Sequence, residues 1–275
     1  ASVIDMLRGV IIQSGNDASK ALAEHIGGSE PAFAEIMNAE AKRLGMKNTN
    51  FMNATGLPDP AHITTARDMA ILAQAIIRDN PKYYPIYSEK EFTYNNIKQG
   101  NRNALLYTDP SVDGLKTGHT EAAGYCLVAS SKRGNMRLIT AVMGTNSMQE
   151  RADQTRALFS WGFSSYETIK PLTAGKVLGD AQVWFGTENH VKAGLDRDLS
   201  ITLPRGQKDK VQAVTRLMPD LEAPIAKGQN VGEVVVTLDG KTLSAQPVVA
   251  MEAVEETNFV VRLWHHLKRF LSNLF

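Results

Sequence analysis

The sequence has one cysteine, almost no net charge and no long apolar run. A single cysteine, Cys126, forms no disulfide within the chain and no cysteine metal cluster, so it leaves the redox compartment open. The 30 lysines and arginines against 29 aspartates and glutamates give a net charge of +1, so no overall field favours nucleic acid as a partner. Without a run of about 18 apolar residues, no membrane-spanning helix is predicted.

Length and composition predict an ordinary globular protein. The 275 residues, 43% of them hydrophobic and 21% charged, are enough for two domains. In the first third, apolar residues recur at helical intervals of three and four. Ser29 and Thr65 are typical helix caps, and Asp17 is the expected cap of the second helix. The spacing predicts helices over residues 3–11, 17–26, 29–44 and 65–79.

Short apolar segments bounded by turn residues predict strands further along. The dipeptides Asn95-Asn96 and Asp239-Gly240 predict hairpins, the second strongly because it tolerates positive φ angles. A helix from Arg151 to residue 162 is expected to close the first part of the chain. The expected strands cover residues 91–94, 112–120, 124–129 and 136–143, and a small β domain covers 171–254.

The triplet Lys116-Thr117-Gly118 lies in one of these strands, which we expect at the rim of the sheet. An ammonium group and a hydroxyl stand there beside a glycine that lets a ligand approach the backbone. This combination predicts a pocket for a carboxylate and hence for anionic substrates. The alternative is that Lys116 has no functional role and is a solvent-exposed residue at the end of a strand.

A second triplet, Ser14-Gly15-Asn16, falls between two predicted helices. By itself it means little, because Ser14 can be a loop residue and Asn16 or Asp17 a helix cap. Its position about a hundred residues before Lys116 matters more. An S-x-N loop, a helical segment and a K-T-G strand are, with S-x-x-K, the motif set of penicillin-binding proteins and class A β-lactamases.

Further stretches accompany these motifs: Leu7–Asp17, Ala66–Ala70, Asn101–Asn103, Val112–Thr120, Val183–Gly186, Pro204–Gly206 and a basic tail. With them, essentially the whole chain resembles the low-molecular-mass D-alanyl-D-alanine carboxypeptidases of Gram-negative bacteria. The resemblance implies an α+β fold in which a penicillin-binding, β-lactamase-like domain has an antiparallel sheet with helices. It places this domain at 1–168, a β-rich domain at 169–256 and an amphipathic helix at 257–275.

The resemblance also implies a periplasmic serine enzyme that removes the terminal D-alanine of peptidoglycan pentapeptides through an acyl-enzyme and is acylated by β-lactams. Ser14 would relay a proton towards the leaving amine, and Asn16 would hydrogen-bond the substrate's amide. Lys116 would lie near Ser14 and favour this proton transfer by its charge. Neither a cofactor nor a metal ion is implied.

The family's carboxylate site would fall on Thr117 and Gly118, together with Arg151, whose fork can bind both oxygens. The backbone N–H of His119 would form half of an oxyanion hole. Arg102 either reaches this cleft or forms a surface ion pair.

One motif of the family is missing. Its S-x-x-K, which supplies the acyl nucleophile and the activating lysine, should precede Ser14, and no S-x-x-K occurs in the 275 residues. Since acyl transfer needs a nucleophile and a base, we expect these residues to be a fragment that is inactive alone. We also expect an open sheet edge and an uncovered apolar face.

The last stretch, residues 258–275, differs from the rest of the chain. Its apolar residues fall on one helical stripe, and its charges are all positive. Such a helix suits an anionic bilayer, so we expect peripheral attachment to the inner membrane. The alternative is a helix docked on the β domain or on a partner. The expected membrane-contacting residues are Phe259, Leu263, Trp264, Leu267, Phe270, Leu271 and Leu274.

Two other functions compete with the carboxypeptidase. A class A β-lactamase deacylates through the glutamate of an E-x-x-L-N loop, and the sequence contains no Leu-Asn dipeptide. A non-catalytic scaffold at the membrane surface is favoured, for this polypeptide alone, by the missing S-x-x-K. The expected partners are therefore the pentapeptide, β-lactams and an anionic membrane.

Overall fold

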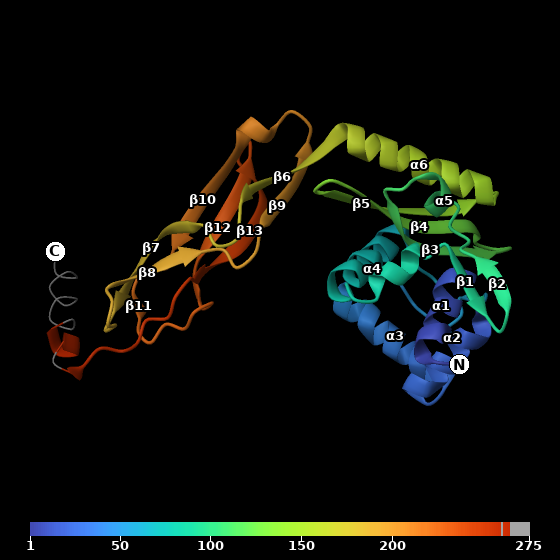
Figure 1. Cartoon of the computed structure of the whole chain (residues 1–275), viewed down its shortest axis with the longest axis horizontal. Coiled ribbons are helices and arrows are strands. Elements are labelled where there is room, and N and C mark those ends of the chain that lie inside the picture. Colours follow the sequence, from blue (N-terminus) through green and yellow to red (C-terminus); the bar gives the residue numbers. More distant parts are fainter. Residues whose placement is uncertain (260, 265–275) are drawn as a thin grey trace. The chain divides into compact units, whose positions relative to one another are not determined.

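The structure is a computed structural model that describes residues 1–259 and 261–264 (Figure 1). The chain divides into two compact units, Ala1–Ser164 and Ser165–Phe275. The first combines helices with an antiparallel sheet, and the second is built from strands. This arrangement confirms the predicted fold class.

The helices of the first unit follow the predicted caps, with one exception. Ser29 and Thr65 cap their helices with their side-chain oxygens. The expected cap at Asp17 is wrong, because Gly15 occupies the N-cap position and Asp17 already lies inside the helix. The elements are α1 (Val3–Arg8), the π-helical η1 (Gly9–Gln13), α2 (Asn16–Gly27), α3 (Glu30–Leu44), α4 (Ala66–Asp79) and the 3-10 helix η2 (Tyr84–Ser88).

The sheet of the first unit has the antiparallel order β3-β4-β5, so β3 and β5 are its edges. Its strands are β3 (Val112–Thr120), β4 (Gly124–Arg133) and β5 (Met136–Thr145). Successive side chains of a strand point to opposite faces. Accordingly Leu138 packs against the apolar cluster that contains Phe159 of helix α6 (Met148–Ser165), and Ile139 packs against the cluster that contains Ala73 of α4. Helices α6 and α4 therefore cover opposite faces of the sheet (Figure 1).

Helix α6 (Met148–Ser165) continues past the predicted end at Gly162. A Cβ on Gly162 would lie 2.6 Å from Leu138 Cδ1, so the glycine permits close packing of helix on sheet rather than ending the helix. The short helix α5 (Leu105–Thr108) precedes β3. Asn95 and Asn96, with φ angles of 50° and 62°, form the turn of the predicted hairpin. Its strands are β1 (Glu91–Tyr94) and β2 (Ile97–Gly100).

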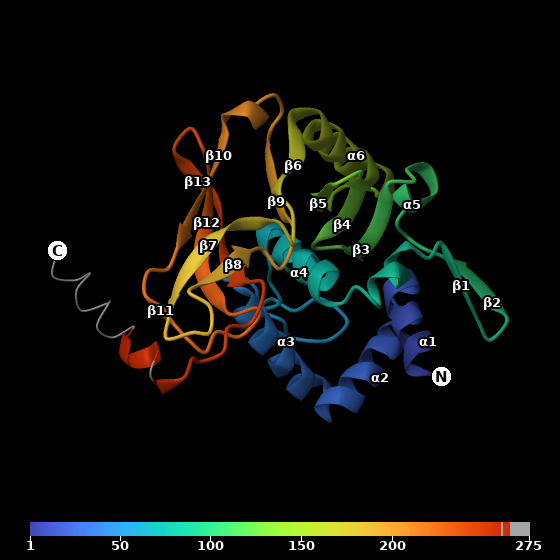
Figure 2. The ribbon, with the colours of Figure 1, turned by 60° about the vertical axis from the view of Figure 1, so that its left-hand side comes forward.

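The second unit contains a two-stranded sheet, β6 (Tyr166–Leu172) with β9 (Leu199–Pro204), and a larger one (Figure 2). The larger sheet has the order β10-β12-β13-β8-β7-β11. The predicted turn at Asp239-Gly240 joins two of its strands. They are β7 (Val177–Trp184), β8 (His190–Gly194), β10 (Val211–Leu217), β11 (Leu221–Glu222), β12 (Asn230–Leu238) and β13 (Lys241–Ala250), and a short 3-10 helix η3 (Lys208–Lys210) precedes β10.

At the C-terminal end, Asn258 begins a helical turn by accepting a hydrogen bond from Val261 N at 3.1 Å. Of the expected membrane-contacting residues, Phe259, Leu263 and Trp264 belong to the described part. Leu267, Phe270, Leu271 and Leu274 lie outside the described residues. None of the helices that the structure describes is both long and apolar enough to cross a membrane.

Candidate active site

Ser14 lies in a sharp bend between η1 and α2. Its φ of 59° and ψ of 43° are in the left-handed region, which costs a non-glycine residue about 1 kcal/mol or more. Its N–H donates to Val10 O at 3.1 Å, and Gly15 then caps α2. The preceding Gln13 donates from Nε2 to Gly100 O (2.5 Å), at the end of β2. These contacts fix the bend that presents the Ser14 hydroxyl.

The structure brings Ser14 into contact with Lys116, although 102 residues separate them. Lys116 Nζ donates one hydrogen bond to Ser14 Oγ and another to Thr117 O at 2.8 Å. Because β3 is an edge strand, its free side is open to a ligand that pairs with it. The S-x-N and K-T-G motifs therefore meet at one edge of the sheet.

Lys116 is half-buried among positive charges. Burial, together with the neighbouring cations Arg102 and Arg151, lowers the pKa of Lys116 from 10.5 to about 8. At neutral pH this amine is mostly protonated, yet it releases its proton far more readily than a free lysine. It can therefore stabilise a negative charge and also take part in proton transfer through Ser14.

Arg151, from the first turns of α6, is only 4% exposed. Its Nη1 lies 3.4 Å from Gly118 O and 3.5 Å from Cys126 O, and its Nη2 lies 3.3 Å from Arg102 O. Among the described residues, no ion pair includes Arg151. A buried cation that is hydrogen-bonded to neutral carbonyls and has no carboxylate partner among the described residues is suited to receive an anionic ligand.

The other predicted strand residues lie on β3, whose Gly118 carbonyl faces this cation. Thr117 is buried, whereas Gly118 and His119 are exposed at the end of β3. A Cβ on Gly118 would meet only Cys126 Cβ, at 3.9 Å, so the chain itself does not require glycine there. The absent side chain instead leaves room for a ligand beside the strand. His119 Nδ1 lies 3.2 Å from Gly124 O.

Two predicted residues lie at the margin of this group. Asn16 is exposed as the first residue of α2, two positions after Ser14. The Arg102 side chain is also exposed, and among the described residues it forms no ion pair. Its charge reaches Lys116, while its carbonyl faces Arg151. Arg102 thus borders the site through both its backbone and its charge.

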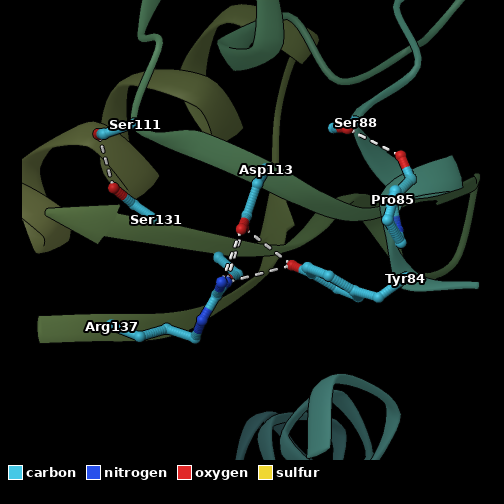
Figure 3. A network of polar contacts seen from close by, with 8 residues as sticks. Tyr84, Pro85, Ser88, Ser111, Asp113, Ser131 and Arg137 are labelled. Atoms are coloured by element: carbon cyan, nitrogen blue, oxygen red, sulfur yellow. Dashed lines mark hydrogen bonds and ion pairs between the residues drawn. The ribbon is translucent and has the colours of Figure 1, made fainter. Parts of the chain in front are cut away.

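Sequence reasoning missed the polar network at the start of β3 (Figure 3). Asp113 accepts hydrogen bonds from Tyr84 Oη at 2.9 Å and from Arg137 Nη1 and Nη2 at 2.8 and 2.7 Å. Tyr84 lies in η2 and Arg137 in β5, so the network joins both to the strand that carries Lys116. No local pattern indicates it, because 29 and 24 residues separate Asp113 from its partners.

Two buried asparagines that flank Arg102 were also missed as site residues. Asn103 is fully buried, and its Nδ2 donates to Gly114 O of β3 at 3.2 Å. Asn101 Oδ1 accepts from Asn103 N at 2.9 Å. These bonds hold the segment whose Arg102 carbonyl faces Arg151. The Asn-x-Asn pattern at residues 101–103 was the sequence signal that could have indicated them.

A Lys-Thr-Gly edge strand that meets a Ser-x-Asn loop, on an antiparallel sheet covered by helices, defines the penicillin-binding class of serine enzymes. Among the described residues, no three histidine, cysteine, aspartate or glutamate side chains are placed to bind a metal ion. The chemistry of the group is that of hydroxyl, amine and guanidinium.

Comparison with known proteins identifies the family. The profile of the D-alanyl-D-alanine carboxypeptidase family matches residues 1–147, and that of the C-terminal domain of penicillin-binding protein 5 matches residues 166–256. The chain is 48% identical, over its whole length and 70% of the relative's, to the D-alanyl-D-alanine carboxypeptidase DacA of Haemophilus influenzae. The chain therefore belongs to the D-alanyl-D-alanine carboxypeptidase family, a family of serine peptidases, as its sequence predicts.

Solved structures agree with this assignment. Penicillin-binding protein 5 from Haemophilus influenzae matches with a TM-score of 0.79 and 49% identity, over 93% of this chain and 75% of that protein. Penicillin-binding protein D2 from Listeria monocytogenes, solved in an ampicillin-bound form, matches with a TM-score of 0.56 and 32% identity. That match covers 59% of this chain and 68% of the Listeria protein.

Proposed function

We propose that the chain provides the carboxylate-binding and proton-transferring part of a serine enzyme that removes the terminal D-alanine from peptidoglycan pentapeptides. One observation carries the proposal: the Lys116 amine contacts the Ser14 hydroxyl beside Arg151, a buried cation whose hydrogen-bond partners among the described residues are backbone carbonyls. A substrate carboxylate between Thr117 and Arg151 would give that cation its counter-charge.

In the proposed reaction, the serine hydroxyl of a preceding S-x-x-K attacks the carbonyl carbon of the penultimate D-alanine, and the lysine of that motif takes the hydroxyl proton. The His119 N–H stabilises the oxyanion, and Asn16 holds the substrate's amide. As the C–N bond breaks, Ser14 passes a proton to the leaving amine, assisted by the charge of Lys116. Water then hydrolyses the acyl-enzyme, which releases the shortened peptide and restores the serine.

A β-lactam would acylate the same serine, with its carboxylate in the place of the D-alanine carboxylate. The Listeria protein in its ampicillin-bound form supports this part of the proposal. We assign the chemistry to residues 1–168, followed by the β-rich domain over 169–256, and we place the protein in the periplasm, where its substrate lies.

The test compares the 275 residues with a longer chain in which a segment bearing S-x-x-K precedes Ala1. Labelled penicillin should acylate the longer chain, and D-alanine should be released from a pentapeptide. The 275 residues alone should do neither, because they contain no S-x-x-K. The control is the longer chain with the serine of that motif changed to alanine.

Three outcomes would contradict the proposal. Rapid hydrolysis of the penicillin would indicate a β-lactamase. A folded longer chain that captures no penicillin and releases no D-alanine would favour the non-catalytic scaffold. Acylation of the 275 residues themselves would show that a residue other than the S-x-x-K serine is the nucleophile.

We further propose that the C-terminal stretch attaches the protein to an anionic membrane surface. In its described part, Phe259, Leu263 and Trp264 are 80%, 62% and 63% exposed. Apolar side chains beside positive charges suit a lipid interface. Vesicles with anionic lipid should retain the full chain and release a chain that ends before Asn258. Equal sedimentation of the two chains would contradict the anchor.

A further inference from the structure

Tyr125 of β4 contacts two predicted site residues, although it belongs to neither motif. It is the register partner of His119 in β3, and the two rings stack with centroids 3.9 Å apart and planes 15° apart. Arg151 Cζ lies 5.7 Å from the centroid of the Tyr125 ring. A guanidinium within about 6 Å of an aromatic face is attracted to it. One ring therefore neighbours both the end of the K-T-G strand and the buried cation.

The backbone of Tyr125 is also connected to the start of α6. Thr145 Oγ1 donates to Tyr125 O at 2.9 Å and lies 3.2 Å from Ser147 O. Ser147 O in turn accepts a hydrogen bond from Arg151 N at 3.1 Å. A register shift in the pairing of β4 with β5 falls between Tyr125 and Leu127, and such a bulge re-aims the side chain beside it.

Arg151 needs an orienting contact of this kind. Its polar contacts are three backbone carbonyls at 3.3 to 3.5 Å, which is long for a charge-assisted hydrogen bond. A guanidinium binds both oxygens of a carboxylate only when its plane is correctly aligned. The face of the Tyr125 ring is the contact that can set this plane.

We propose that Tyr125 is a positioning residue that aims the Arg151 fork at the carboxylate of the substrate. Its ring orients the guanidinium, and its carbonyl, through Thr145 and Ser147, locates the helix that carries Arg151. The inference rests on the proposed function, because it requires that Arg151 binds this carboxylate. It predicts that Tyr125 affects the binding of a ligand that has a carboxylate and not of the same ligand without it.

The experiment titrates the full chain by NMR with an acetylated tripeptide ending in D-Ala-D-Ala and with its C-terminal amide. The wild type should bind the acid more tightly than the amide. Tyr125→Leu should reduce this preference roughly three- to tenfold and leave the affinity for the amide unchanged. Tyr125→Phe should retain the preference. Tyr94→Leu, which removes a ring that is 48% exposed on the β1–β2 hairpin, is the matched control.

The outcomes separate the inference from the function on which it rests. A wild type that does not distinguish acid from amide contradicts the proposed function. A discriminating wild type together with an equally discriminating Tyr125→Leu variant overturns the role of Tyr125 alone. On an Arg151→Ala background, Tyr125→Leu should cause no further loss of preference, and a further loss would contradict the route through Arg151.

A second variant covers the case in which circular dichroism shows that Tyr125→Leu does not fold. Thr145→Val keeps the ring and removes the hydroxyl that holds Tyr125 O. It should lower the preference for the acid in the same direction. An unchanged preference in this variant would overturn the inference.

Discussion

The two units use their buried positions differently. Among the described residues, every buried polar or charged side chain belongs to the first unit, and the buried residues of the second unit are apolar or glycine. Burial of a polar group costs stability unless the group is hydrogen-bonded. The first unit buries such groups, several of them on or beside the K-T-G strand, and the second unit does not. The buried polar residues are Asp68, Asn101, Asn103, Thr117, Ser130, Ser131, Thr140, Thr145, Arg151 and Thr155.

The largest expected effect comes from placing a charge in the apolar core of the second unit. Leu199 is fully buried there, so Leu199→Asp should destabilise this unit by more than about 4 kcal/mol. Urea unfolding should show the loss, while the acid tripeptide should still bind, because its site lies in the first unit. Leu243→Asp, at a position that is 36% exposed, should have little effect. A mild effect of Leu199→Asp would break the comparison.

In the first unit, removing a buried carboxylate should destabilise the protein, whereas in the second unit introducing one should do so. Asp68, 1% exposed, accepts hydrogen bonds from Asn48 N and Thr49 Oγ1, both at 2.8 Å. Asp68→Ala leaves these donors unpaired and should lower the free energy of unfolding by about 3 kcal/mol. Asp68→Asn should cost less, since its carbonyl can still accept. The control is Asp79→Ala, at an exposed position, and equal losses in urea would contradict the prediction.

The lowered pKa of Lys116 predicts a pH dependence that the apolar core of the second unit lacks. Between about pH 8 and pH 10.5 the Lys116 amine is protonated in the unfolded state but has lost its proton in the folded state. The free energy of unfolding should therefore rise with pH in this range. We expect a gain of roughly 2 kcal/mol, less than the full shift because Lys116 is only half-buried. Lys116→Met should remove the gain. Parallel curves of unfolding free energy against pH for the wild type and this variant would contradict the prediction.

The smallest effect is expected from the network at the start of β3. Asp113 and Arg137 form a two-pronged ion pair, but their side chains are 32% and 26% exposed. A double-mutant cycle with Asp113→Asn and Arg137→Met should therefore give a coupling energy of only about 1 kcal/mol in urea unfolding. A coupling near zero would show that the network does not stabilise the strand.

The parts of the fold that could be predicted depend on local signals. Thr65 announces a helix start, and Asn95-Asn96 a turn, because a few neighbouring residues decide both. The cap at Asp17 failed because its neighbour Gly15 took the cap position. The helix itself was predicted, and the error concerns only the position at which its first turn begins.

The sequence indicated the site residues that belong to a motif. It did not indicate the residues that reach the site only through the pairing of distant segments. The contact of Ser14 with Lys116 follows from two motifs that the sequence shows plainly. Tyr125 becomes visible only through its register opposite His119, and Asp113 only through distant partners. Such contacts depend on how strands align, which local residue patterns do not specify.

The most direct test of the central claim is the rate at which labelled penicillin acylates the longer chain that carries S-x-x-K, with and without Lys116. We predict that Lys116→Ala lowers both acylation and D-alanine release about a hundredfold or more, because the amine supports proton transfer through Ser14. Circular dichroism should show an intact fold. Unchanged rates in a folded Lys116→Ala variant would contradict the account.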